Sequence, residues 1–349
     1  MSDPERADGE SPPLQGEEDV KGRALYFSEP GAVEVRDRPV PKPGAGEVRV
    51  RTELSAVSPG TELLVYRGEV PESMSTDETI GALGGTFSYP MQYGYAAVGR
   101  VTAVGGDVTD DWLDRQVFAF HPHESHFVAD TEELIATTLL AEEALLIPNV
   151  EAAVSFAMDA RPRLGERVVV FGQGPVGLLT TAVLSEFPLA ELVAVDRYGL
   201  RRELARSFGA DCAVGPGEIG EVVDGDGADV SIELSGAPAA LDEAIETTGY
   251  AGQVLVGSWY GTRDVELNLG GDYHRSHIRL RSSQVSRIDP DHAGRWDKER
   301  RLSYVRSWLE RTDVSELFTH RFDLAEADEA YRLLDERKDE AVQVAFDYG

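Results

Sequence analysis

The feature that most constrains the fold of this chain is a glycine-rich turn between two apolar segments. Residues 167–171 have the pattern of a buried strand, residues 172–177 read Gly-Gln-Gly-Pro-Val-Gly, and residues 178–187 form an apolar helical pattern that ends before Pro188. Asp196 follows the next strand-like run, 24 residues after Gly172. This glycine spacing, with an acid at that distance, is typical of a dinucleotide-binding βαβ unit. The sequence therefore predicts a parallel, doubly wound sheet.

Each residue of the turn has a physical role in holding a dinucleotide. Gly172 allows the tight turn, Gly174 lets a pyrophosphate approach the backbone, and Gly177 lets the helix pack closely on the strand. Pro175 and Val176, within the turn, are further expected cofactor contacts. The N-terminus of the helix that follows offers free N–H groups and a partial positive charge to the phosphates. A simple strand–helix turn is the alternative, which the full context disfavours.

The residue after the second strand indicates which dinucleotide binds. Asp196 favours NAD, because a carboxylate suits the ribose hydroxyls and repels a 2′-phosphate. Arg197 follows it directly, and Arg201 and Arg202 lie close by, so these arginines could hold a 2′-phosphate of NADP or form a solvated helix face. Ser235, after the third strand-like run, is a further expected cofactor contact.

The remaining patterns divide the chain into four parts. Residues 1–20 are acidic and almost free of apolar side chains, which predicts a disordered leader. Residues 21–155 show short apolar or alternating runs between Gly, Pro and Asp, as in an irregular β domain. Residues 156–295 alternate strand and helix patterns and form the nucleotide-binding domain. Residues 296–349 contain two amphipathic helical patterns and a last strand, which we expect to return to the first domain.

Composition excludes several functions. The 349 residues include 33 Lys plus Arg against 63 Asp plus Glu, a formal net charge of −30, which disfavours binding to nucleic acid or to an anionic membrane. Cys212 is the single cysteine, so an intramolecular disulfide and a multi-cysteine zinc site are excluded. Few lysines together with many acids suit a cytosol of high salt. Because the sequence also lacks a signal-peptide pattern and a long apolar run, we expect a halophilic, cytoplasmic protein.

The order of parts and three motifs resemble the medium-chain dehydrogenase/reductase superfamily over roughly residues 22–349. The motifs are Ser-Pro-Gly-Thr-Glu at 58–62, Tyr-Gly-Tyr-Ala-Ala-Val-Gly-Arg-Val at 93–101, and the glycine turn at 172–177. The resemblance implies an α/β fold with a GroES-like β-rich catalytic domain and a Rossmann domain. It also implies a dinucleotide in the cleft between them, hydride transfer to or from the nicotinamide, and a homodimer. Residues 55–68 look most like the branch containing bacteriochlorophyllide hydroxyethyl dehydrogenase and are similar to zinc-free quinone reductases.

The chain departs from the zinc-dependent members at the metal positions. Pro59 stands where their motif has a Cys ligand, and Gly94 is followed by Tyr95 and Ala96 where they have a His and a Glu. Their relay His falls near Leu64. Because a tetrahedral zinc site needs thiolate and imidazole ligands there, we predict a zinc-independent enzyme.

Hydride removal from an alcohol also requires a base or a relay near the nicotinamide. Thr61 matches the hydroxyl that hydrogen-bonds the substrate oxygen in zinc members, and Glu62 matches the acid of that motif. Tyr95 replaces a ligand and by position faces the cleft. Its phenol could exchange a proton with a carbonyl oxygen, or it could only fill the space of the metal. Tyr66 is a further candidate.

A histidine-rich run leaves a metal hypothesis open. His121, His123 and His126 lie within six residues together with Glu124, and two of them would share one face of an extended segment. Pro122 and the adjacent turn favour solvated or oxyanion-contacting histidines instead.

Taken together, the motifs and the resemblance predict an NAD(P)-dependent oxidoreductase of a secondary alcohol or ketone. Enone or quinone reduction and a non-catalytic dinucleotide sensor are the alternatives.

Overall fold

The nucleotide-binding part of the chain folds into a six-stranded parallel sheet. The computed structural model describes residues 21–77 and 80–349, so the expected leader lies outside the described residues. The strand order is β10-β9-β8-β11-β12-β13, with every neighbouring pair parallel. The strands are β8 Arg167–Phe171, β9 Glu191–Val195, β10 Cys212–Val214, β11 Ala228–Glu233, β12 Thr248–Val256 and β13 Arg279–Ser282. The order reverses between β8 and β11, which is where doubly wound sheets bind their ligands.

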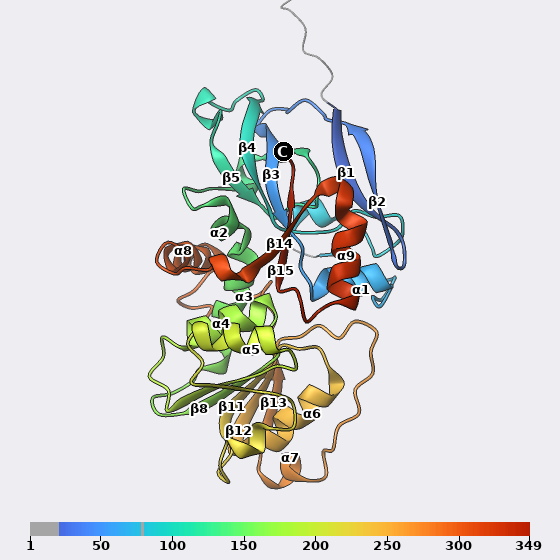
Figure 1. Cartoon of the computed structure of the whole chain (residues 1–349). Helices are drawn as coiled ribbons and strands as arrows, with labels where there is room; N and C mark the ends of the chain where they lie inside the picture. Colours follow the sequence, from blue (N-terminus) through green and yellow to red (C-terminus); the bar gives the residue numbers. More distant parts are fainter. Residues whose placement is uncertain (1–20, 78–79) are drawn as a thin grey trace, which may run out of the picture.

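The other large sheet has seven strands and belongs to the β-rich domain, at the opposite end of the molecule (Figure 1). Its order is β14-β15-β3-β4-β5-β7, with β6 also paired to β3, and β1 and β2 form a separate antiparallel pair. These strands are β1 Lys21–Glu29, β2 Ala32–Pro39, β3 Glu47–Ala56, β4 Ala97–Val104, β5 Gln116–Ala119, β6 His126–Asp130, β7 Leu134–Ala136, β14 Phe318–Asp323 and β15 Gln343–Asp347. The two sheets confirm the predicted α/β fold class. The last strand, β15, pairs antiparallel with β3 of this domain.

Nine α-helices lie among the described residues. They are α1 Thr61–Arg67, α2 Ala141–Leu145, α3 Ile147–Ala160, α4 Pro175–Leu184, α5 Gly199–Ser207, α6 Pro238–Thr247, α7 Asp272–Arg275, α8 Lys298–Leu309 and α9 Ala327–Glu336. Helix α3 has no counterpart in the sequence prediction. Because 13 of its 14 residues are buried, it has no solvent-exposed polar face. It extends across the expected domain boundary at residues 155/156. Within the described ranges, no helix combines the length and apolar character needed to span a membrane.

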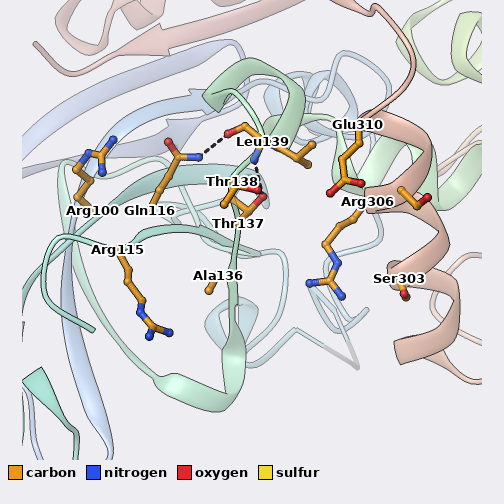
Figure 2. A pocket seen from close by; sticks show the side chains of 11 residues that line it. Arg100, Arg115, Gln116, Ala136, Thr137, Thr138, Leu139, Ser303, Arg306 and Glu310 are labelled. Carbon is orange, nitrogen blue, oxygen red and sulfur yellow. Dashed lines mark hydrogen bonds between the residues drawn. The ribbon is translucent and has the colours of Figure 1, made fainter. Parts of the chain in front are cut away.

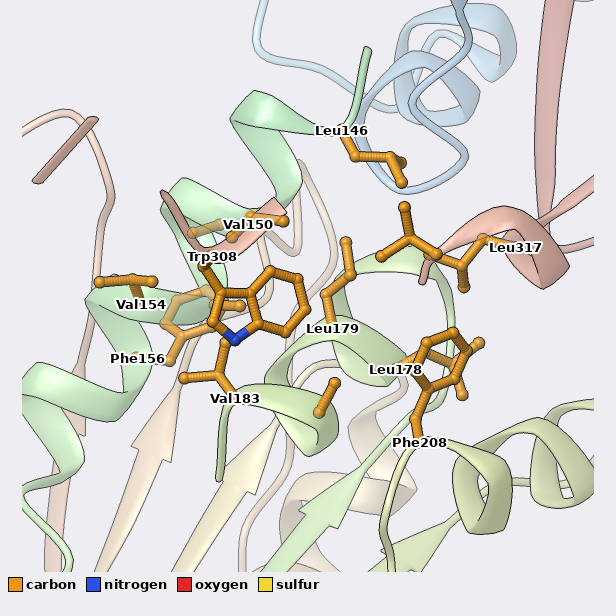
Figure 3. Close-up of a cluster of buried hydrophobic side chains, with 14 of the residues drawn as sticks. Leu146, Val150, Val154, Phe156, Leu178, Leu179, Val183, Phe208, Trp308 and Leu317 are labelled. Carbon is orange, nitrogen blue, oxygen red and sulfur yellow. The ribbon is translucent and has the colours of Figure 1, made fainter. Parts of the chain in front are cut away.

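Helix α8 is fixed against α3 by apolar and ionic contacts. Figure 3 shows the Trp308 ring of α8 among apolar side chains of α3 and α4. Arg301 is 1% exposed and donates to Glu151 Oε1 of α3 at 2.7 Å and to Ser155 Oγ at 2.7 Å. A buried guanidinium that lost its carboxylate would be strongly destabilising. The position of α8 is therefore well defined.

Candidate active site

The glycine turn lies where the strand order reverses and is packed too closely for other residues. Gly172 has φ +90°, and a Cβ on it would lie 2.6 Å from the Ser235 backbone nitrogen after β11. A Cβ on Gly177 would lie 1.9 Å from the Gly172 carbonyl oxygen. The N-terminus of α4 begins at Pro175 directly after Gly174 and has no acidic residue in its first turn. The turn thus offers backbone N–H groups at a helix N-terminus, as phosphate binding requires.

Asp196 holds this turn from the end of β9. Its side chain is buried, with Oδ2 accepting a hydrogen bond from the Gln173 backbone N–H at 2.7 Å and Oδ1 accepting one from the Tyr198 N–H at 2.8 Å. Ser235 is held by Glu233, whose Oε1 accepts hydrogen bonds from the Ser235 backbone and hydroxyl, both at 2.6 Å. The sequence prediction missed Glu233, because its contact with Ser235 depends on the local turn after β11.

Two of the three arginines near Asp196 bond to backbone carbonyls. Arg201 donates to the carbonyl oxygens of Lys338 at 3.1 Å and Ala341 at 3.0 Å. Arg202 donates to the carbonyl of Asp196 itself at 2.8 Å. The Arg197 guanidinium lies over the Tyr198 ring, 4.9 Å from its centre.

Lys338 completes a group of cations beside the turn. Burial and the charges of Arg67, Arg197 and Arg201 lower the pKa of Lys338 to about 8. Gly174 has open space on the side that faces Arg201. A Cβ added to Gly174 would lie 4.0 Å from Arg201 Nη1. These cations give a chain of net charge −30 a local positive region next to the predicted phosphate position. The sequence prediction missed Lys338, because it is distant from Arg197 along the chain and only folding brings the two together.

A continuous set of contacts leads from this turn to the β-rich domain. Gly236, after Ser235, donates its N–H to Ser258 Oγ at 2.8 Å. The next residue, Trp259, has its ring 5.8 Å from the ring of Phe87, which belongs to the β-rich domain. The Tyr93 ring lies 5.6 Å from that of Phe87, and the Tyr95 ring lies 6.3 Å from that of Tyr93. The motif tyrosine therefore lies across the domain contact from the glycine turn.

Tyr95 meets the hydroxyl groups of the first motif. Its phenol donates to Ser58 Oγ at 2.5 Å. Burial raises the pKa of Tyr95, and the neighbouring Ser58 and Thr61 hydroxyls act in the opposite direction. The phenol is therefore protonated at neutral pH, and the three hydroxyl groups form a proton-donating cluster.

Glu62 is fully buried beneath this cluster. Its Oε1 accepts a hydrogen bond from the Ser58 backbone N–H at 2.7 Å, and its Oε2 lies 3.0 Å from His123 Nε2. Tyr331 of α9 donates to the same Oε2. Tyr66 is also buried, stacked on Tyr331 with ring centres 5.4 Å apart. Both side chains are buried, and a part for Glu62 and Tyr66 in proton transfer stays a prediction.

The histidine run is divided among three surroundings. His121 stacks on Phe127 with ring centres 4.0 Å apart, and burial lowers its pKa to about 4. His123 turns inward, where its Nδ1 lies 2.7 Å from Ser55 Oγ, and His126 Nδ1 lies 3.1 Å from Ser125 Oγ. Among residues 21–77 and 80–349, no three His, Cys, Asp or Glu side chains are grouped to hold a metal.

The residues at the family's metal position do not fit zinc. Pro59 has no donor atom, and Tyr95 presents a phenol whose proton is donated to Ser58. Because burial raises the pKa of Tyr95, the phenolate needed for metal binding is disfavoured. Zinc prefers thiolate, imidazole or carboxylate ligands, which this position lacks.

Comparisons with known proteins agree with the resemblance. Residues 175–295 match the family model described as zinc-binding dehydrogenase. An L-threonine 3-dehydrogenase of Saccharopolyspora erythraea is 30% identical over 278 residues, covering 67% of this chain and 76% of that protein.

Solved structures share the fold over nearly the whole chain. An Escherichia coli alcohol dehydrogenase in complex with NADH has a TM-score of 0.75 at 20% identity, covering 94% of this chain and 99% of that one. A zinc-binding dehydrogenase of Sinorhizobium meliloti bound to NADP has a TM-score of 0.73 at 18% identity, covering 94% and 99%. The chain belongs to the medium-chain dehydrogenase/reductase superfamily and is an NAD(P)-type oxidoreductase.

Proposed function

We propose that this protein is a zinc-independent, NAD-dependent oxidoreductase that interconverts a secondary alcohol and its ketone. The observation that carries the proposal is the protonated Tyr95 phenol, hydrogen-bonded to Ser58 and close to Thr61, at the position where related enzymes have a metal ligand. A proton donor beside a carbonyl oxygen supplies the stabilisation that a metal would otherwise provide.

The nicotinamide, when bound, supplies or accepts the hydride. In the reducing direction, Tyr95 exchanges its bond to Ser58 for one to the substrate carbonyl and gives its proton to that oxygen. The carbonyl π bond breaks, and a C–H and an O–H bond form. Thr61 hydrogen-bonds the same oxygen and orients it. In the oxidising direction the tyrosinate form of Tyr95 accepts the alcohol proton. The raised pKa of Tyr95 disfavours this tyrosinate form at neutral pH.

Glu62 acts in this proposal as a positioning residue. It accepts the Ser58 N–H and so fixes the residue that holds the Tyr95 phenol. His123 and Tyr331 hold the other carboxylate oxygen from two distant parts of the chain. The buried carboxylate therefore joins the first motif to α9 and to the histidine run.

NAD rather than NADP is supported by the buried carboxylate of Asp196 at the end of β9. A 2′-phosphate beside it would meet a like charge. Arg201 and Arg202 already donate to backbone carbonyls. The cations around Lys338 are then available to the pyrophosphate rather than committed to a 2′-phosphate.

Reduction of an enone or quinone is a second candidate function. A row of aromatic rings runs from Tyr95 through the buried Tyr93 and Phe87 to Trp259, whose ring is only partly buried. Flat conjugated substrates stack favourably on such rings. The same proton donor would serve this reaction, so a substrate panel is needed to separate the two.

We further propose a cytoplasmic homodimer adapted to high salt. Strand β13 lies at one edge of the six-stranded sheet and pairs only with β12 among the described residues. A second copy could extend the sheet at this edge. The net charge of −30 supports the salt adaptation.

The test is hydride transfer at high salt with panels of secondary alcohols, ketones, enones and quinones, followed by nicotinamide absorbance. Turnover of alcohols or ketones is expected, and turnover confined to enones or quinones would select the second candidate. Tight NADH binding without turnover of any class would overturn the enzymatic proposal and favour a dinucleotide sensor.

A further inference from the structure

A groove lined by arginines lies apart from the dinucleotide site. It has a volume of about 820 Å³ and shares no lining residue with the glycine turn or the Tyr95 cluster. Its two sides come from the sheet of the β-rich domain and from α8 (Figure 2). The volume falls within the range of small-molecule sites.

The α8 side presents one stripe of the helix. Ser303, Arg306, Ser307 and Glu310 line the groove, and their spacing places them on one helical face. The opposite face of α8 is buried through Arg301 and Trp308. Because that buried face fixes the position of α8, the backbone that carries the groove-lining side chains is also fixed.

The sheet side adds two more arginines and several hydroxyl groups. Arg100 and Arg115 line it together with Thr137 and Thr138. Gln116 holds this side by donating to the Leu139 carbonyl at 2.7 Å, as Figure 2 shows.

The groove has a local charge opposite to that of the chain. Arg100, Arg115 and Arg306 face one acid, Glu310, although acids outnumber basic residues almost two to one overall. Arg100 is paired with Glu53 at 3.0 Å. Arg115 and Arg306 make no ion pair within the described part of the chain.

We propose that this groove binds a phosphorylated small molecule. Guanidinium groups bind phosphate oxygens through paired hydrogen bonds, and the Thr and Ser hydroxyls supply further donors. The volume exceeds that of a phosphate ion, so a phosphate ester fits better than the free ion. A ligand held by Arg115 and Arg306 would join the β-rich domain to α8.

The test is calorimetric titration of the NADH-saturated protein with glycerol 3-phosphate and with inorganic phosphate, at constant ionic strength. Saturation with NADH prevents either probe from occupying the dinucleotide site. The variants are Arg306→Gln, Arg115→Gln and the double variant, with Arg311→Gln as the control. Arg311 follows α8 but pairs with Glu186 outside the groove.

Saturable binding of one ester per chain is expected. Each groove variant should weaken it by about tenfold, as loss of a charge-assisted hydrogen bond does, and Arg311→Gln should leave it unchanged. Equal affinity for inorganic phosphate would overturn the assignment of an ester and identify the free ion as the ligand. Absence of saturable binding by either probe, or equal binding by the double variant with its NADH affinity intact, would overturn the proposal as a whole.

Discussion

Replacing Tyr95 with Phe removes the phenol and leaves the ring in place. In the structure this deletes the hydrogen bond to Ser58 Oγ at 2.5 Å. Loss of one such bond costs about 1 kcal/mol of folding free energy, which lowers Tm by no more than about 3 °C in a protein of this size. If the phenol is the proton donor, kcat falls by about 10²–10⁴-fold. The catalytic effect should therefore greatly exceed the effect on stability.

The assay measures kcat, the Kd for NADH and Tm for the wild type and Tyr95→Phe. Tyr89→Phe is the matched control, because Tyr89 donates to the Val65 carbonyl and lies outside the proposed site. The control should keep its kcat while losing a comparable hydrogen bond. A Tyr95→Phe enzyme that keeps kcat within about threefold of wild type would refute the role of proton donor and make Tyr95 a residue that only fills space.

Three further outcomes follow from the geometry. Gly177→Ala should weaken NADH binding by at least about tenfold, because its Cβ would lie 1.9 Å from the Gly172 carbonyl oxygen. NADH titration of this variant is compared with that of Gly199→Ala, whose Cβ has nothing within 4 Å. Equal losses of NADH affinity in the two variants would contradict the prediction. NADH should bind at least about tenfold more tightly than NADPH, and Asp196→Asn should narrow that ratio; tighter NADPH binding by the wild type would count against Asp196. Burial raises the pKa of Glu124 from 4.5 to about 7, so the folded state binds more protons than the unfolded state and loses stability as pH rises through this range. Denaturant unfolding across this pH range should show a smaller loss of unfolding free energy for Glu124→Gln than for the wild type. The same pH dependence in both proteins would contradict the raised pKa of Glu124.

Local spacing was sufficient to predict the strand, the glycine turn and the helix after it. The roles given to Gly172 and Gly177 depend on backbone packing within one βαβ unit, so they are encoded in a short stretch of sequence. The strand–helix alternation likewise indicated the doubly wound sheet. Helix α3 could not be predicted in the same way, because a helix buried on almost all sides has no solvent face to contrast with an apolar one.

Contacts between distant segments account for what the sequence did not show. The carboxylate of Glu62 bonds to His123, 61 residues away, and to Tyr331, 269 residues away. The cations beside the glycine turn include Lys338 from the C-terminal segment. Such pairings depend on the tertiary fold, which residue spacing alone does not specify.

Hydride transfer by this protein is proposed to need no zinc. Turnover is measured after exhaustive chelation, with the metal content of the same sample determined by mass spectrometry. We expect full activity with far less than one zinc per chain and no gain in activity when zinc is added. Activity that is lost on chelation and restored by stoichiometric zinc would contradict it.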